Sequence, residues 1–183
     1  MSGIINATNL EVANIKDSTG TNTAMTVNSN GTMTPSKMVI ASFKIADHVT
    51  VSAQELITNW TTLSAPHTTL GASMTHSSGI FTFPHTGKFL IQAQFQCQAS
   101  GGNRTYAGGS IQYSSDSGSS YSKLTRSLTG IWTDGGWATT FCQVLIEITN
   151  VSTQRVAFHV YVQGSTSLYT GDNGTQCTFQ QVG

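Results

Sequence analysis

The sequence predicts an all-β protein whose short strands pack as a sandwich or barrel. Charged residues make up only 9% of the 183 residues, and Thr, Ser, Gly and Asn take their place. This composition favours strands and turns over long helices. After residue 38, apolar residues recur with a period of two, as in half-buried strands. Clusters of Gly, Asn and Ser separate nearly every pair of such runs, which indicates many strands joined by turns.

Two regions of different composition divide the chain at residue 37. Residues 1–37 are polar and hold few large apolar groups, whereas residues 38–183 carry the strand-like runs of a single head domain. Turn signals at 17–20 and 28–31 separate short extended pieces in the first region. Such pieces are marginal alone, so they are either disordered or paired with copies of themselves or another protein. If they pair with another protein, the residues predicted to attach the chain to it are Leu10, Val12, Ile15, Met25 and Val27.

The strands of the head are predicted in order from alternation and β-branched or aromatic content. The run Met38 to Ile45 opens the domain, and Lys88 to Gln98 is the clearest strand because its apolar and amide residues alternate throughout. The other runs are Gly79 to Phe83, Ser110 to Tyr113, Tyr121 to Ile131, Ala138 to Thr149, Arg155 to Val162 and Thr175 to Val182.

The second faces of two strands are too apolar for ordinary solvent-facing surfaces. Phe141 and Leu145 alternate with residues that already form an apolar face, and Leu90 lies in a row of glutamines on the Lys88 to Gln98 strand. Such a surface favours burial against a neighbouring subunit. The alternative is an exposed neutral strand face. The predicted subunit interface comprises Leu90, Gln92, Gln94, Gln96, Phe141, Gln143 and Leu145.

The charge pattern argues against nucleic-acid and membrane partners. Net charge is zero and the eight Lys and Arg residues are scattered, so no basic stripe can neutralise a phosphate backbone. No apolar run approaches 18 residues and no basic segment precedes an apolar one at the start. We therefore expect a product made in the cytoplasm without membrane insertion.

Catalytic and metal-binding patterns are not found in the sequence. Three cysteines at wide spacings predict buried free thiols rather than a disulfide framework or a zinc site. The five histidines lack metal-ligand spacing, although one His159 per chain could still meet on a symmetry axis. No close carboxylate pair and no Gly-x-Ser-x-Gly motif is present. We expect no enzymatic activity, no metal and no cofactor.

Two stretches place large side chains among glycines and are predicted to be loops. They lie at 103–106 and 130–137, and their candidate ligand-contact residues are Arg104, Tyr106, Trp132 and Trp137. Aromatic residues on loops commonly stack on sugar rings or protein partners. The alternative is that these side chains fold back on the core.

The run GIFTFPHTGKFLI from Gly79 to Ile91 resembles a strand, turn and strand of the C1q and tumour-necrosis-factor-like jelly rolls. The closing run DNGTQCTFQQVG from Asp172 to Gly183 is similar to the last strand of bacterial and phage members. This resemblance covers residues 38–183. It implies a ten-strand jelly-roll sandwich that forms parallel homotrimers, with the inner sheet facing the threefold axis and carrying the predicted interface residues.

A second resemblance covers residues 9–34, where NIKDSTG and AMTVNSNGTM look like a segment of phage structural proteins that precedes fibre or knob heads. It implies a virion protein on the particle exterior, as a fibre tip, knob or capsid decoration. Residues 1–37 would bind other virion proteins, and the head would stabilise the particle or contact the host, including its surface glycans. The alternative is a C1q-like glycan-binding lectin or adhesin that is not part of a virion.

Overall fold

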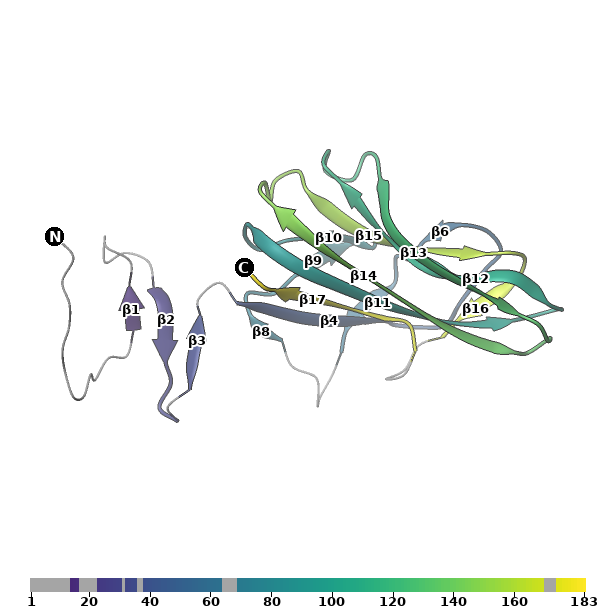
Figure 1. The fold of residues 1–183 in the computed structure, drawn as a ribbon, viewed down its shortest axis with the longest axis horizontal. Helices are drawn as coiled ribbons and strands as arrows, with labels where there is room; N and C mark the ends of the chain where they lie inside the picture. Colours follow the sequence, from purple (N-terminus) through teal and green to yellow (C-terminus); the bar gives the residue numbers. More distant parts are fainter. Residues whose placement is uncertain (1–13, 17–22, 31, 36–37, 64–68, 170–173) are drawn as a thin grey trace. The chain divides into compact units, whose positions relative to one another are not determined.

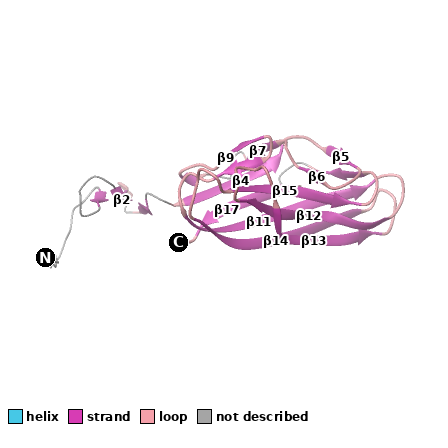
Figure 2. Cartoon of the chain, turned by 90° about the horizontal axis from the view of Figure 1, so that it is seen from above, coloured by secondary structure: helices cyan, strands magenta, loops and turns pink. Residues whose placement is uncertain are grey.

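The computed structural model describes residues 14–16, 23–30, 32–35, 38–63, 69–169 and 174–183. Contacts divide the chain into two compact units, Met1–Met38 and Val39–Gly183, one residue from the expected boundary. The described residues form strands and loops only (Figure 2), which confirms the all-β prediction. Among them no helix is present that could cross a membrane.

The N-terminal unit contains a three-stranded antiparallel sheet. Its strands are β1 (Asn14–Lys16), β2 (Thr23–Val27) and β3 (Met33–Pro35), in the order β1-β2-β3. The expected turn between β2 and β3 is closed by Asn28, whose amide N–H donates to the Thr32 carbonyl at 2.8 Å. Ile15 is exposed and lies opposite Met25 in register. Leu10 and Val12, which were predicted to join the attachment surface, lie outside the described residues.

The head is a sandwich of two sheets. The larger has eight strands, with β4, β17, β11 and β14 side by side (Figure 1). The long β11 pairs with β14 along one edge and with β17 and then β16 along the other. The strands of this sheet are β4 (Val39–Ile45), β5 (Val49–Val51), β7 (Trp60–Thr62), β8 (Leu70–Gly71), β11 (Gly87–Ala99), β14 (Trp137–Ile148), β16 (Thr166–Leu168) and β17 (Gln176–Gln181).

The second sheet has six strands and runs in the order β13-β12-β15-β10-β9, with β6 paired to β15. These strands are β6 (Glu55–Leu56), β9 (Thr75–Ser77), β10 (Ile80–Thr82), β12 (Arg104–Ser114), β13 (Ser122–Ile131) and β15 (Arg155–Val162). The described residues form more strands than the ten expected, because strands of two or three residues such as β5, β6 and β8 extend the sheets.

The core lies between the two sheets and is rich in phenylalanine. Phe81, Phe158 and Phe179 pack edge-on or tilted, with ring centroids 5.0 to 5.9 Å apart. Each comes from a different strand and is fully buried. Aromatic contacts of this kind stabilise a core beyond the area they bury. The ring contacts thus join β10 and β15 of the smaller sheet to β17 of the larger one.

One close approach between the sheets depends on a glycine. A Cβ on Gly109 of β12 would come within 2.3 Å of the Phe95 ring on β11. Phe95 is fully buried, so the ring has no free space to move into. The absence of a side chain at residue 109 is therefore what lets the aromatic ring occupy this layer.

Candidate functional site

The predicted interface residues share the outward face of β11 and β14. Register places Leu90 opposite Leu145, Gln92 opposite Gln143 and Gln94 opposite Phe141. The intervening residues of β11, such as Phe89, Ile91 and Phe95, are buried in the core. We call this surface, with the outward residues of β17 and β4 beside it, the β11–β14 face.

Large apolar side chains stand open on the β11–β14 face. Phe141 is 52% exposed and Leu145 is 59% exposed, although both lie in the middle of a long, regular strand. Their neighbours Cys142 and Ile148 point inward and are buried. An apolar group left in water loses the stabilisation of about 25 cal/mol per Å² that burial would give. This geometry suits a surface that another molecule covers.

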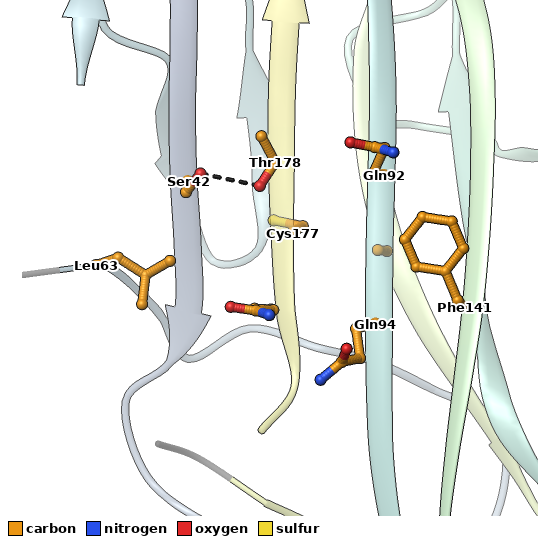
Figure 3. A pocket seen from close by; sticks show the side chains of 9 residues that line it. Ser42, Leu63, Gln92, Gln94, Phe141, Cys177 and Thr178 are labelled. Atoms are coloured by element: carbon orange, nitrogen blue, oxygen red, sulfur yellow. Dashed lines mark hydrogen bonds between the residues drawn. The ribbon is translucent and has the colours of Figure 1, made fainter. Parts of the chain in front are cut away.

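A hollow of about 280 Å³ lies beside Phe141 on this face (Figure 3). Its lining carries no charged side chain: it consists of Ser42, Leu63, Gln92, Ala93, Gln94, Phe141, Gln176, Cys177 and Thr178. The hydroxyls of Ser42 and Thr178 are hydrogen-bonded at 2.9 Å. The Gln94 amide donates to the Gly174 carbonyl at 3.0 Å. The polar groups that line the hollow are thus partly hydrogen-bonded within the chain. The hollow can therefore accept an uncharged side chain.

The sequence predicted Arg104 on an exposed loop, and this prediction is wrong. Arg104 is the first residue of β12 and is only 7% exposed. Its guanidinium donates to the carbonyls of Ser165, Gly102 and Asn103 at 2.6 to 3.0 Å, and also to the Ser100 carbonyl. A buried charge needs such partners to offset its desolvation. Arg104 therefore fixes the loops at this end of the head and is not available for a ligand.

The three predicted aromatic residues are exposed, but two of them lie in strands. Tyr106 is part of β12 and is 40% exposed, and Trp137 begins β14 and is 51% exposed. Trp132 follows β13 and is 74% exposed, and its ring lies so close over Gly130 that a Cβ there would meet it at 2.8 Å. The alternative, that these side chains fold back on the core, therefore does not hold for any of the three.

The sequence did not predict Tyr169 and His48, whose rings lie in a row with that of Trp137. Tyr169 places its ring centroid 4.1 Å from that of Trp137 and 4.2 Å from that of His48. Tyr169 follows β16 and His48 precedes β5. No sequence motif links these positions, because only the pairing of β16 with β11 and β5 brings them together.

The reactive side chains of the described residues offer little chemistry. Cys97, Cys142 and Cys177 are free and buried, which confirms the sequence prediction. Burial raises the pKa of Cys97 to about 12 and that of Cys142 to about 11, so neither is a thiolate near neutral pH. Within the described ranges, no group of three or more His, Cys, Asp and Glu could hold a metal ion. His159 lies on β15 of the six-stranded sheet and therefore does not point from the β11–β14 face.

Comparison with known proteins shows the fold. No family model matches the chain, and no curated protein matches it. The structure of Eiger TNF from S. frugiperda is similar with a TM-score of 0.63 and 13% identity, over 80% of this chain and 94% of that one. Murine APRIL, in a crystal structure at pH 8.5, has a TM-score of 0.59 and 10% identity, over 80% of this chain and 100% of that one. The head thus has the tumour-necrosis-factor-like jelly roll that the Gly79 to Ile91 motif implied.

Proposed function

We propose that this chain is a homotrimeric, non-enzymatic structural protein on the exterior of a bacteriophage particle, as a fibre tip, knob or capsid decoration. In this proposal the head associates with two other copies through the β11–β14 face. Residues 1–37 attach the trimer to other virion proteins. The head then stabilises the particle or contacts the host surface.

The observation that carries the proposal is the exposure of Phe141 and Leu145 on an otherwise regular sheet. Leu90 and the glutamines of β11 complete a surface that is mostly apolar and amide-rich, with Lys88 opposite Glu147 at one end. The jelly-roll likeness of the sequence implies parallel trimers with this sheet toward the axis. The separate three-stranded unit at the N-terminus supports a distinct attachment role for residues 1–37.

Light scattering of the full chain tests the association. We expect a solution mass three times the chain mass of 19.4 kDa for the full chain, and three times its own smaller chain mass for residues 38–183 alone. Leu145→Lys places a charge in the interface and should lower the mass to that of one chain. Leu124→Lys is the matched control, because Leu124 is an exposed strand leucine on the six-stranded sheet, and this variant should keep the trimer mass. A monomeric wild-type chain, or equal masses for both variants, would contradict the proposal.

Virion attachment needs its own measurement. We expect the full chain to be found by mass spectrometry in density-purified phage particles from a culture whose DNA encodes it. Removal of residues 1–37 should abolish the presence of the chain in the particle. The remaining head should keep the mass of a trimer. A chain that stays in the soluble fraction would argue against a virion role.

A second candidate is a free C1q-like glycan-binding lectin or adhesin, and the exposed ring of Trp137 favours it. The two functions differ in what residues 1–37 do. A lectin would bind its glycan equally well without these residues and would not be found in purified particles.

A further inference from the structure

Three aromatic rings form a row on the eight-stranded sheet, at one end of β14, β16 and β5. The row consists of Trp137 at the start of β14, Tyr169 after β16 and His48 before β5. Successive ring centroids are 4.1 and 4.2 Å apart, and the rings are tilted by 55° and 51°. None of the three belongs to the hydrophobic core cluster. Trp137 and His48 are exposed and Tyr169 is half-buried, so the row is open to solvent. We call it the aromatic row.

The sheet fixes the central ring from several directions. The backbone N–H of Tyr169 donates to the Gln96 carbonyl at 3.1 Å, and its carbonyl accepts from Thr175 at 2.7 Å. The Tyr169 hydroxyl donates to the side-chain oxygen of Gln98, whose amide donates to the Gly135 carbonyl at 3.0 Å. Rings held in place before a ligand arrives lose little conformational entropy on binding.

The loop beside Trp137 is also preorganised. The Asp134 carboxylate accepts the backbone N–H groups of Gly101, Gly102 and Gly135 at 2.7 to 3.0 Å. These bonds tie the loop after β13 to the loop after β11. They also lower the pKa of Asp134, because they favour its charged form. The edge of the aromatic row is therefore as well fixed as its centre.

The chemistry of the aromatic row matches a sugar ring. Exposed aromatic faces bind apolar C–H surfaces, and the hydroxyls and amide around them provide the hydrogen bonds that an apolar partner could not use. Ser167 and Thr50 lie beside the row and are hydrogen-bonded across β16 and β5 at 3.4 Å. The Asp134 carboxylate at the edge of the row already accepts three backbone N–H groups, so the row favours an uncharged ligand.

We propose that the aromatic row binds a neutral saccharide by stacking its sugar rings on Trp137 and Tyr169. This site lies at the Gln96 end of the β11–β14 face, whereas Leu90 and Leu145 lie toward the opposite end. Trp137 lies four residues before Phe141 on β14, which corresponds to roughly 13 Å at 3.3 Å per residue. The inference rests on the proposed attachment function, because it names the class of ligand that the head recognises.

Binding of the full chain to a panel of neutral oligosaccharides, built from hexoses and N-acetylhexosamines, tests the proposal by calorimetry and tryptophan fluorescence. We expect at least one member to bind. Trp137→Ala should weaken that binding at least about tenfold, as expected for loss of an aromatic anchor. Trp132→Ala should bind within about twofold of wild type, because its ring lies over Gly130 outside the row.

Tyr169→Phe provides a second variant that keeps the ring and removes only the hydroxyl to Gln98. It should weaken binding less than Trp137→Ala does, while circular dichroism shows the same fold. Absence of binding to every neutral oligosaccharide, or unchanged binding by Trp137→Ala, would overturn the proposal. Loss of the trimer mass in Trp137→Ala without any saccharide binding would also overturn it, because the row would then be a contact between copies. A monomeric chain that binds saccharide through Trp137 would leave this inference standing and contradict the trimer.

Discussion

The outward faces of the two sheets differ in how they cover their large side chains. On the six-stranded sheet, Tyr161 is only 8% exposed although it lies outside the cluster of core residues between the sheets. The ammonium of Lys123 lies 4.8 Å from its ring centroid and the guanidinium of Arg126 lies 5.4 Å away. This face therefore covers its own large side chain with cations that also suit solvent.

Among the described residues, no cation lies over Phe141 in this way. Phe141 and Leu145 remain more than half exposed beside their cross-strand neighbours Gln94 and Leu90. This difference supports the proposal that a partner completes the β11–β14 face, whereas the six-stranded sheet covers its large side chain within one chain. It also predicts that equivalent mutations on the two faces have different consequences.

The largest expected effect follows from truncating the covered ring. Tyr161→Ala should lower the free energy of unfolding by about 3 kcal/mol or more, because it removes a nearly buried aromatic side chain. Chemical denaturation measures this loss, which should not depend on protein concentration. Phe141→Ala is the counterpart on the β11–β14 face. It should reduce the concentration dependence of the melting temperature instead. Equal, concentration-independent losses of stability for both variants would contradict this difference between the two faces.

The interior between the faces gives the next largest effect. Gly109→Ala forces a methyl group into the Phe95 ring and should cost about 1 to 3 kcal/mol of unfolding free energy. Combining it with Phe95→Leu should cost less than the sum of the two single changes, since the smaller side chain makes room. Strict additivity in denaturant titrations would show that the close approach is not the cause.

A smaller effect is expected from the hydroxyl of Tyr161. It accepts a hydrogen bond from the buried Gln112 amide at 3.1 Å. Tyr161→Phe should therefore lower the free energy of unfolding by about 0.5 to 1.5 kcal/mol. The ring and its contacts with Lys123 and Arg126 stay in place, so this variant separates the hydrogen bond from the packing lost in Tyr161→Ala. A loss as large as that of the alanine variant would contradict this division.

The smallest effect concerns pH. Burial lowers the pKa of His159 on β15. The His159 ring lies near the Tyr121 ring, and His159 pairs with Ser110 of β12. Arg126 of β13 pairs with Ser110 from the other edge of β12. The unfolded chain then binds more protons than the folded one below the ordinary pKa of about 6.5. Stability should thus fall as pH drops through about 6.5 and level off below the folded pKa.

His159→Gln should flatten this acid-side loss of stability in melts between neutral and mildly acidic pH. Part of the slope should remain, because burial also lowers the pKa of His76 and acts in the same direction. A variant whose stability falls as steeply as that of the wild type would show that His159 does not contribute.

Much of the fold could be predicted from local patterns. Alternation in Lys88 to Gln98 and in Ala138 to Thr149 anticipated β11 and β14 and their outward residues, including Phe141 and Leu145, but it left Trp137 in a loop. The short strands β5 and β16 were not expected, because three residues carry too little periodicity to detect. Arg104 was assigned to a loop because glycines precede it, yet it lies in β12.

The sequence alone separated the two faces of β11 and β14, since the two-residue period is a property of the extended backbone. The tertiary structure alone decided which of those residues become neighbours. His48, Trp137 and Tyr169 come from distant parts of the chain and meet through strand order and register. Arg104 is likewise buried by carbonyls from two loops that converge only in the folded head. Pairing between distant segments depends on the whole sheet, so no local pattern encodes it.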